Sequence, residues 1–210
     1  MYPIILEQFS PEVALWIPDT KAIKPAYEKL KEQEPNLAFP FWAKVWASSK
    51  AMVNFLQEEP TWIEKKDVLE IGAGIGIPSL SIAAQTKKII ISDYAPDAVS
   101  LLQMNIKHLK LSNAVALNID WNNIPDDIIA DTILLSDTNY EPDAHNNLVL
   151  LIEKFIKKGS TIILATPNRL SSNSFIKRIS KYVYCNKNYG IIENKILVEI
   201  AVVVLKENKG

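Results

Sequence analysis

A short run of glycines, with acids on either side of it, is the part of this chain best suited to chemistry. The segment 68–78 reads V-L-E-I-G-A-G-I-G-I-P, so Glu70 stands two residues before the first of three glycines. Glycine lets the backbone turn sharply and lets a ligand lie against bare main chain. Asp93 follows Gly72 by 21 residues, close to the spacing of about 20 expected of an acid that hydrogen-bonds a ribose in a βαβ unit. The pattern therefore predicts a site for a nucleotide-like ligand.

The glycine spacing and the position of Glu70 favour one class of cofactor. Dinucleotide sites prefer G-x-G-x-x-G, where a helix N-terminus holds a pyrophosphate, but the order here is G-x-G-x-G. A carboxylate at Glu70 would repel a pyrophosphate and attract the amino group or sulfonium of S-adenosylmethionine. The order E-x-G-x-G-x-G resembles that of the seven-β-strand S-adenosylmethionine-dependent methyltransferases. A dinucleotide-dependent oxidoreductase is the alternative from another class.

Short apolar runs predict the strands that must position these residues. They lie at 67–71, 88–92, 114–117, 132–136 and 161–165. Such continuous runs are typical of parallel strands buried on both faces. Helical patterns separate them, and a further helix begins near Ser48 or Ser49, either of which would cap it. The alternation predicts an α/β fold with a doubly wound, Rossmann-like sheet.

The two ends of the chain depart from this alternation. Residues 182–185 and 195–205 read as two strands joined by a loop containing Asn188 and Gly190. This predicts a C-terminal antiparallel hairpin that completes a mostly parallel, seven-stranded sheet. Six of the twelve prolines fall within residues 1–40, which predicts an irregular N-terminal arm with one short helix near 25–32. Residues 41–210 would form the methyltransferase domain.

Residues after the third and fourth predicted strands extend the resemblance. Asn118-Ile119-Asp120-Trp121 follows the third strand, where this class places an acid on the adenine amino group and a bulky side chain on the ring. The fourth strand runs into S-D-T-N-Y-E-P at 136–142, and D-x-x-Y followed by E-P resembles the branch that methylates lysines of non-histone proteins. P-F-W-A at 40–43 is similar to methyltransferases acting on the electron-transfer flavoprotein beta subunit. Thr138-Asn139 is more polar than the branch's usual V-V or V-I, which points to a different acceptor.

The resemblance implies a role for each matching residue. Asp137 would orient the acceptor amine and Tyr140 would line the lysine channel, as the two catalytic residues; a helix N-cap and a core tyrosine are their structural alternatives. Trp42 or Trp46 would face the methionine end of the cofactor. The implied cofactor-binding residues are Trp46, Glu70, Gly72, Ala73, Gly74, Gly76, Asp93, Tyr94, Asp120, Trp121 and Ser136. For Asp120 and Trp121, a turn carboxylate and a half-buried tryptophan are the alternative.

Composition excludes several other classes. The net charge of -1 and pI near 6.2 provide no strongly basic field, so nucleic acid is not the expected partner. His108 and His145 are far apart without cysteine partners, so no metal site is expected. The start lacks the basic and apolar regions of a signal peptide, and the longest apolar run near the end is too short for a membrane span. The single cysteine, Cys185, fits a reducing compartment, so we expect a cytoplasmic protein.

These observations predict an S-adenosylmethionine-dependent N-methyltransferase that methylates a lysine side chain of a protein and releases S-adenosylhomocysteine. Three alternatives remain: a methyltransferase for a small amine or other metabolite, a non-catalytic S-adenosylmethionine-binding module, and the dinucleotide-dependent enzyme. The N-terminal arm distinguishes the first from a protein methyltransferase. Folded across the pocket it favours a small substrate, whereas held aside it leaves a groove for a protein.

Overall fold

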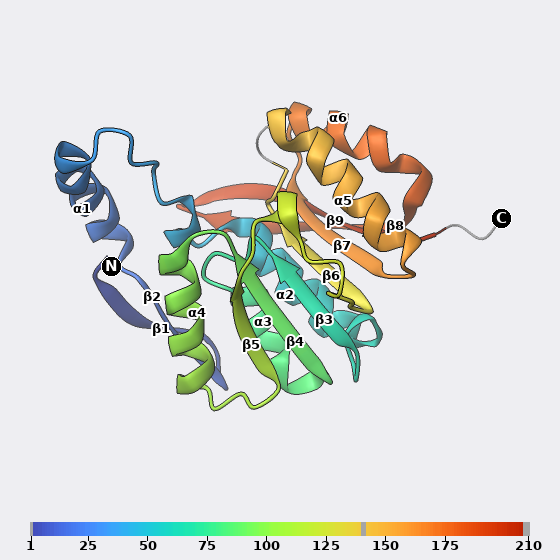
Figure 1. Cartoon of the computed structure of the whole chain (residues 1–210), viewed down its shortest axis with the longest axis horizontal. Coiled ribbons are helices and arrows are strands. Elements are labelled where there is room, and N and C mark those ends of the chain that lie inside the picture. Colours follow the sequence, from blue (N-terminus) through green and yellow to red (C-terminus); the bar gives the residue numbers. More distant parts are fainter. Residues whose placement is uncertain (1, 140–141, 208–210) are drawn as a thin grey trace.

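The predicted alternation builds one mixed sheet with the strand order β5-β4-β3-β6-β7-β9-β8 (Figure 1). A computed structural model describes residues 2–139 and 142–207. The parallel strands are β3 (Asp67–Ile71), β4 (Lys88–Asp93), β5 (Ala114–Asn118), β6 (Thr132–Ser136) and β7 (Thr161–Pro167), and the antiparallel strands are β8 (Val183–Glu193) and β9 (Ile196–Leu205). The α/β fold class and the five parallel strands are confirmed.

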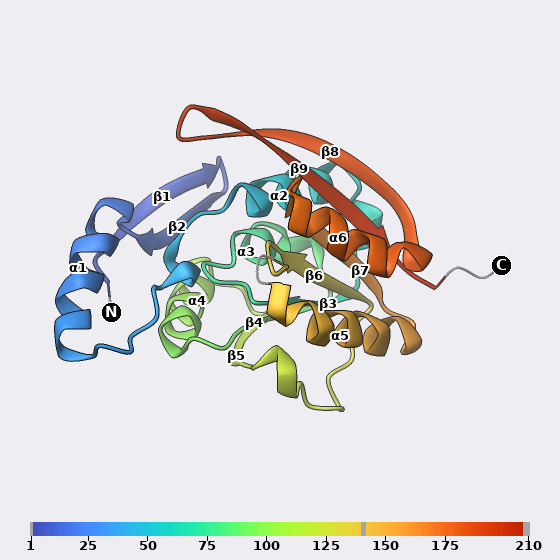
Figure 2. The same cartoon turned by 90° about the horizontal axis from the view of Figure 1, so that it is seen from above.

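Helices cover both faces of the sheet and enclose two apolar clusters (Figures 1 and 2). The helices α2 (Ala47–Glu58), α3 (Ile77–Ile82) and α4 (Pro96–His108) contribute to one cluster, and α5 (His145–Lys157) and α6 (Leu170–Ile179) to the other. Short 3-10 turns are η1 (Phe41–Ala43), η2 (Pro60–Trp62), η3 (Ala83–Gln85), η4 (Trp121–Asn123), η5 (Pro142–Ala144) and η6 (Ser180–Tyr182). Alternate residues of each strand enter the two clusters, as expected of a sheet buried on both faces.

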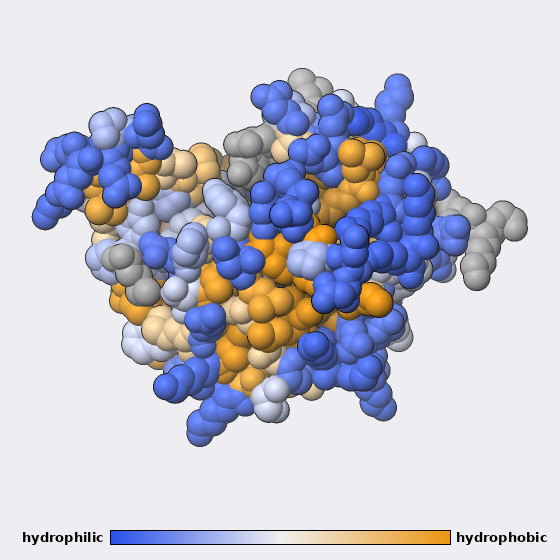
Figure 3. Space-filling view, viewed as in Figure 1, coloured by the Kyte–Doolittle hydropathy of each residue, from blue (hydrophilic) through white to orange (hydrophobic). Residues whose placement is uncertain are grey.

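The connection from β5 to β6 has only η4 as regular structure, so no helix covers the adjoining part of the sheet. Figure 3 shows apolar side chains gathered over this area. Val115 is 37% exposed there, and Ile90 is half-buried.

Within the described part of the chain, no helix is long and apolar enough to cross a membrane.

The expectation of an irregular arm is wrong. β1 (Ile4–Ser10) and β2 (Val13–Pro18) form an antiparallel hairpin, and α1 (Thr20–Gln33) follows, with the Asp19 side chain accepting from the Lys21 amide at its start. Leu15 and Ile17 are fully buried in the same cluster as the sheet. Pro25 lies inside the helix, where it has no N–H to donate to the carbonyl four residues earlier. The division of the chain at residue 40 stays a prediction.

Two local predictions also need correction. β8 continues through Asn188 and Gly190, and the hairpin turns instead at Asn194 and Lys195, whose φ angles are +50° and +66°. Asparagine and glycine favour turns, but pairing along the whole of β9 outweighs that local preference. Neither Ser48 nor Ser49 caps α2: the helix begins at Ala47, and the Ser49 hydroxyl donates to the Trp46 carbonyl.

Candidate active site

The glycine loop after β3 adopts backbone φ angles that would be strained for residues other than glycine. Gly72, Gly74 and Gly76 have φ angles of +66°, +55° and +77°. A Cβ atom on Gly74 would lie 2.8 Å from the Trp42 carbonyl oxygen, and one on Gly76 would lie 2.3 Å from Leu102 Cδ2. The loop is therefore packed against a segment from the N-terminal region on one side and against α4 on the other.

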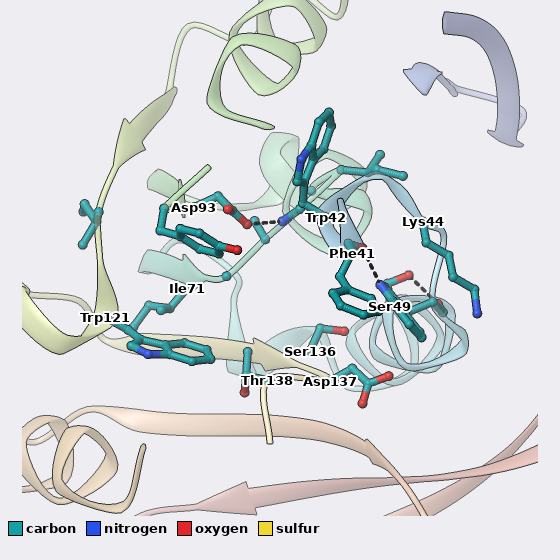
Figure 4. A pocket seen from close by; sticks show the side chains of 18 of the residues that line it. Phe41, Trp42, Lys44, Ser49, Ile71, Asp93, Trp121, Ser136, Asp137 and Thr138 are labelled. Carbon is teal, nitrogen blue, oxygen red and sulfur yellow. Dashed lines mark hydrogen bonds between the residues drawn. The ribbon is translucent and has the colours of Figure 1, made fainter. Parts of the chain in front are cut away.

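A cavity of about 560 Å³ opens at the carboxyl ends of β3, β4, β5 and β6 (Figure 4). Ligands of doubly wound folds bind at this edge, where loops replace hydrogen-bonded strands. The lining residues that the sequence predicted for the site are Trp42, Trp46, Gly72, Ala73, Gly74, Gly76, Asp93, Tyr94, Asp120, Trp121, Ser136 and Asp137. Others, including Phe39, Phe41, Lys44 and Ser49, were not predicted. The one available signal was the P-F-W-A segment, which contains Phe41 and is flanked by Phe39 and Lys44.

Asp93 fixes the glycine loop to the end of β4. Its Oδ2 accepts from the Gly74 amide at 2.8 Å, and its Oδ1 accepts from the Ala95 amide at 2.9 Å. The side chain is 3% exposed. Burial raises the pKa of the Asp93 carboxyl, and these amides oppose the shift. A carboxylate oxygen accepts more than one hydrogen bond, so Asp93 retains capacity for a ligand hydroxyl in the cavity.

Glu70 lies beneath the glycine loop and does not line the cavity. The side chain is fully buried, and its Oε2 accepts from the Ser79 amide at 3.1 Å, near the start of α3. Its Oε1 has no hydrogen-bond partner among the described residues. Burial raises the pKa of Glu70 from 4.5 to about 7. Direct contact between Glu70 and a cofactor stays a prediction.

The buried position of Glu70 makes stability depend on pH. Because the folded-state pKa of Glu70 is raised, the native state binds its proton more tightly, and stability falls as pH rises between about 4.5 and about 7. We expect this loss to be about 3 kcal/mol larger in the wild type than in Glu70→Gln. Urea unfolding of both proteins from pH 4.5 to 8 measures the difference. Parallel pH profiles for the two proteins would contradict the assignment.

Asp120 and Trp121 line the wall of the cavity that lies opposite the segment 38–46. The Asp120 Oδ1 accepts from the backbone and side-chain nitrogens of Asn122, both at 2.9 Å, so it caps η4. Trp121 is half-buried and lies beside Gly72, where an added Cβ would be 3.6 Å from its Cζ3. Figure 4 shows the Trp121 indole and Ile71 on this side of the cavity. Trp121 and Ile71 together form an apolar wall of the cavity that suits a flat ring.

Asp137 directly follows β6 and carries a buried carboxylate. Its φ is +55°, its amide donates to the Ala165 carbonyl at 2.9 Å, and it is 8% exposed. Burial and the negative charge of Glu193 raise the pKa of the Asp137 carboxyl, while the positive charges of Arg169 and Lys44 and the neighbouring Ser48 side chain lower it. The residue is not the N-cap of α5, which is Ala144. The other predicted catalytic residue, Tyr140, lies outside the described residues.

Several buried polar atoms around Asp137 lack hydrogen-bond partners within residues 2–139 and 142–207. They are Ser48 Oγ, Ser136 Oγ, Asp137 Oδ1, Thr138 Oγ1 and both side-chain polar atoms of Asn139. Buried polar groups are normally hydrogen-bonded, so such a cluster needs an explanation, and a bound polar ligand is one. By contrast, no group of three or more His, Cys, Asp or Glu side chains that could hold a metal occurs in the described part of the chain.

Comparisons with known proteins agree with this geometry. A family model described as "Lysine methyltransferase" matches residues 27–182. The chain is 28% identical over 146 residues to the calmodulin-lysine N-methyltransferase of Arabidopsis thaliana, covering 64% of this chain and 48% of that protein. It is 26% identical over 132 residues to the electron transfer flavoprotein beta subunit lysine methyltransferase of Mus musculus, covering 62% and 51%.

A solved structure confirms the fold. The N-methyltransferase NodS of Bradyrhizobium japonicum, in complex with S-adenosylhomocysteine, superposes with a TM-score of 0.61 at 14% identity, covering 86% of this chain and 98% of that one. At this identity the likeness concerns the fold alone. The present chain spans about half the length of the two relatives described above.

Proposed function

Because the chain belongs to the lysine methyltransferase family, whose model matches residues 27–182, we propose that it transfers a methyl group from S-adenosylmethionine to the ε-amine of a lysine in another protein. The observation that carries the proposal is Asp137, a buried carboxylate with an unpartnered oxygen, in the same cavity as the glycine loop. The glycine loop would bind the cofactor, and the Asp137 carboxylate would bind the acceptor amine. A dinucleotide enzyme would not need the second feature.

The cavity fits the proposed cofactor. Trp121 and Ile71 would hold the adenine, with Asp120 near its amino group, and Asp93 would accept from the ribose hydroxyls. The main chain of Gly72, Ala73 and Gly74 lines the cavity and would lie against the remainder of the cofactor. When bound, S-adenosylmethionine supplies a methyl group on a positively charged sulfur. Trp46, Tyr94, Gly76 and Ser136 complete this proposed set, with Glu70 supporting the loop from below.

The protein's own residues would prepare the acceptor amine. A lysine amine with an ordinary pKa near 10.4 must lose a proton before it attacks, which costs about 4 kcal/mol at neutral pH. Enclosure in an apolar pocket lowers the pKa of that amine by disfavouring the ammonium form. The Asp137 carboxylate would accept a hydrogen bond from the amine and orient its lone pair towards the methyl group, and the released proton would pass to solvent.

The position of the N-terminal arm supports a protein acceptor over a small molecule. Of its residues that the structure describes, only Ala38 and Phe39 line the cavity. The β1–β2 hairpin and α1 lie to one side of the sheet (Figure 2). Phe41, at 47% exposure, gives the lining an apolar outer surface that a polypeptide would cover. We infer that the cavity receives a side chain from a macromolecule docked outside it.

Two measurements test the proposed function together. Thermal unfolding with S-adenosylmethionine, S-adenosylhomocysteine or NAD should show stabilisation by the first two only. Transfer of labelled methyl from S-adenosylmethionine to a cell lysate should then label a discrete protein band, with the label on lysine. Label confined to the small-molecule fraction would favour the metabolite alternative. Binding without any transfer would favour the non-catalytic module.

Replacing Asp93 with alanine should weaken cofactor binding at least tenfold. The substitution removes both the proposed ribose contact and the bond that holds the Gly74 amide, and hydrogen bonds to a charged group contribute about 1.5–3 kcal/mol each. Isothermal titration with S-adenosylhomocysteine measures the effect. Asp97→Ala is the matched control, because that acid lies four residues further on and does not line the cavity. Equal affinity for both variants would remove Asp93 from the site.

We also propose a reducing compartment, the cytoplasm, as the location. The single cysteine, Cys185, is free and exposed, and burial of part of its side chain raises the pKa of the thiol, which disfavours the reactive thiolate. Fractionation of cells expressing a tagged chain, with markers for each compartment, tests this proposal.

A further inference from the structure

Lys44 lies beside the cavity in the surroundings that an acceptor lysine would need. Its Nζ lies 3.2 Å from Glu193 Oε1 and 4.1 Å from the centroid of the Trp46 ring. Lys44 and Trp46 both line the cavity, whereas Glu193 comes from the end of β8. We propose that Glu193 and Trp46 form the entry site for the acceptor's ammonium group, and that Lys44 fills this site as an internal competitor until the acceptor displaces it. This inference rests on the proposed function.

The chemistry of the pair suits a lysine ammonium. A carboxylate and the face of a tryptophan ring both attract a cation, and the two contacts together define a position for it. A lysine side chain fits this position, because Lys44 itself occupies it. The Trp46 ring is held in place, since its Nε1 donates to the Phe41 carbonyl at 3.1 Å. The aromatic face is therefore present before an acceptor arrives.

Displacement of Lys44 is feasible because both side chains of its ion pair are partly exposed, and because the buried Glu193 Oε1 has no hydrogen bond among the described residues that would have to be broken. The Lys44 and Glu193 side chains are 40% and 26% exposed, and exposed ion pairs of this kind are weak. An incoming lysine would form the same contacts as Lys44, so the exchange replaces one cation with another. Lys44 then returns to solvent, where its charge is well hydrated.

The entry site is connected to the proposed catalytic residue. The charges of both Lys44 and Glu193 act on the Asp137 carboxyl, and Figure 4 shows Lys44 and Asp137 on the side of the cavity away from Trp121. The Glu193 side chain is 26% exposed and Asp137 is 8% exposed, and one carboxylate oxygen of each is buried without a hydrogen-bond partner among the described residues. An acceptor ammonium would thus meet Glu193 first and Asp137 next, approaching from the side opposite the proposed adenine wall.

A purely structural role for Lys44, tying the C-terminal hairpin to the segment after η1, is the competing explanation. A second ion pair provides the matched control. Lys187 pairs with Glu58 and joins β8 to α2, its Nζ lies 5.8 Å from the Tyr189 ring centroid, and neither charged residue lines the cavity. Breaking that pair removes a comparable tie without touching the proposed entry site.

The test uses n-butylammonium chloride, which reproduces the lysine side chain, as a probe for the whole protein saturated with S-adenosylhomocysteine. Binding is followed at low salt by the NMR signal of the Trp46 indole N–H, assigned with Trp46→Phe. Lys44→Met should bind the probe at least threefold more tightly than wild type, and Glu193→Gln at least fivefold more weakly. Glu58→Gln and Lys187→Met should stay within twofold, and neutral n-butanol should not distinguish the variants.

The sign of the Lys44→Met effect separates the two explanations. Removal of a competitor strengthens probe binding, whereas loss of a structural tie weakens it or leaves it unchanged, and either of the latter results overturns the proposal. Unchanged affinity in a folded Glu193→Gln protein also overturns it. Failure of the protein to bind S-adenosylhomocysteine would instead count against the proposed function, and it would be seen before any probe is added.

Discussion

Replacing Asp137 with asparagine is expected to lower the turnover number for methyl transfer at least a hundredfold, while the affinity for S-adenosylmethionine changes less than twofold. The buried carboxylate is the proposed partner of the acceptor amine, and a positioned group of this kind typically contributes 10²–10⁴-fold. Asparagine has nearly the same volume and tolerates a positive φ, so it preserves the +55° backbone at this position. The variant therefore removes the charge and little else.

The measurement is steady-state transfer of labelled methyl to the protein band identified in lysate, together with titration of the cofactor. Asp143→Asn is the control, because Asp143 is an exposed acid in the same connection, within η5. Full turnover by Asp137→Asn with normal cofactor binding would show that the carboxylate has no part in the reaction. A large loss of cofactor affinity would instead assign Asp137 to the cofactor site.

Replacing Gly74 with alanine should destabilise the protein by about 2–4 kcal/mol and weaken cofactor binding at least tenfold. A left-handed residue other than glycine costs about 1 kcal/mol. The added Cβ would also lie 2.8 Å from the Trp42 carbonyl oxygen, and forcing an extra methyl group into a packed site typically costs about 1–3 kcal/mol. Because the contact is with main chain, no side chain can move aside to relieve it.

Gly159 provides the comparison that isolates the close contact. Its φ is +88°, but an added Cβ would have no atom within 4 Å. Gly159→Ala should therefore cost only the backbone strain, about 1 kcal/mol, and leave cofactor affinity unchanged. Urea unfolding and titration with S-adenosylhomocysteine give both quantities. Equal destabilisation by the two substitutions would show that the contact with Trp42 is unimportant.

Local sequence predicted those parts of the fold that depend on one uninterrupted pattern. The run 132–136 reads T-I-L-L-S, with three apolar residues at its centre, and forms β6. A parallel strand buried on both faces shows no alternation of polar and apolar side chains. The prediction of an irregular N-terminal arm was wrong. Proline density suggested irregular structure, whereas Leu15 and Ile17 pack into the large core that the sheet provides. The predicted position of the turn in the C-terminal hairpin was wrong, because pairing with β9 overrides the preference of Asn188 and Gly190 for a turn.

The chain's sequence by itself determined that the glycine loop and the acids at or just after the ends of β4, β5 and β6 line one cavity, because the carboxyl ends of parallel strands lie at one edge of the sheet. Only the tertiary structure decided where Glu70 lies: burial under the loop directs it to Ser79 and away from the cavity. Only the tertiary structure brought Lys44 to Glu193 across 149 residues. Pairs so distant in sequence depend on how the C-terminal hairpin packs beside the N-terminal segment, and no local pattern encodes that contact.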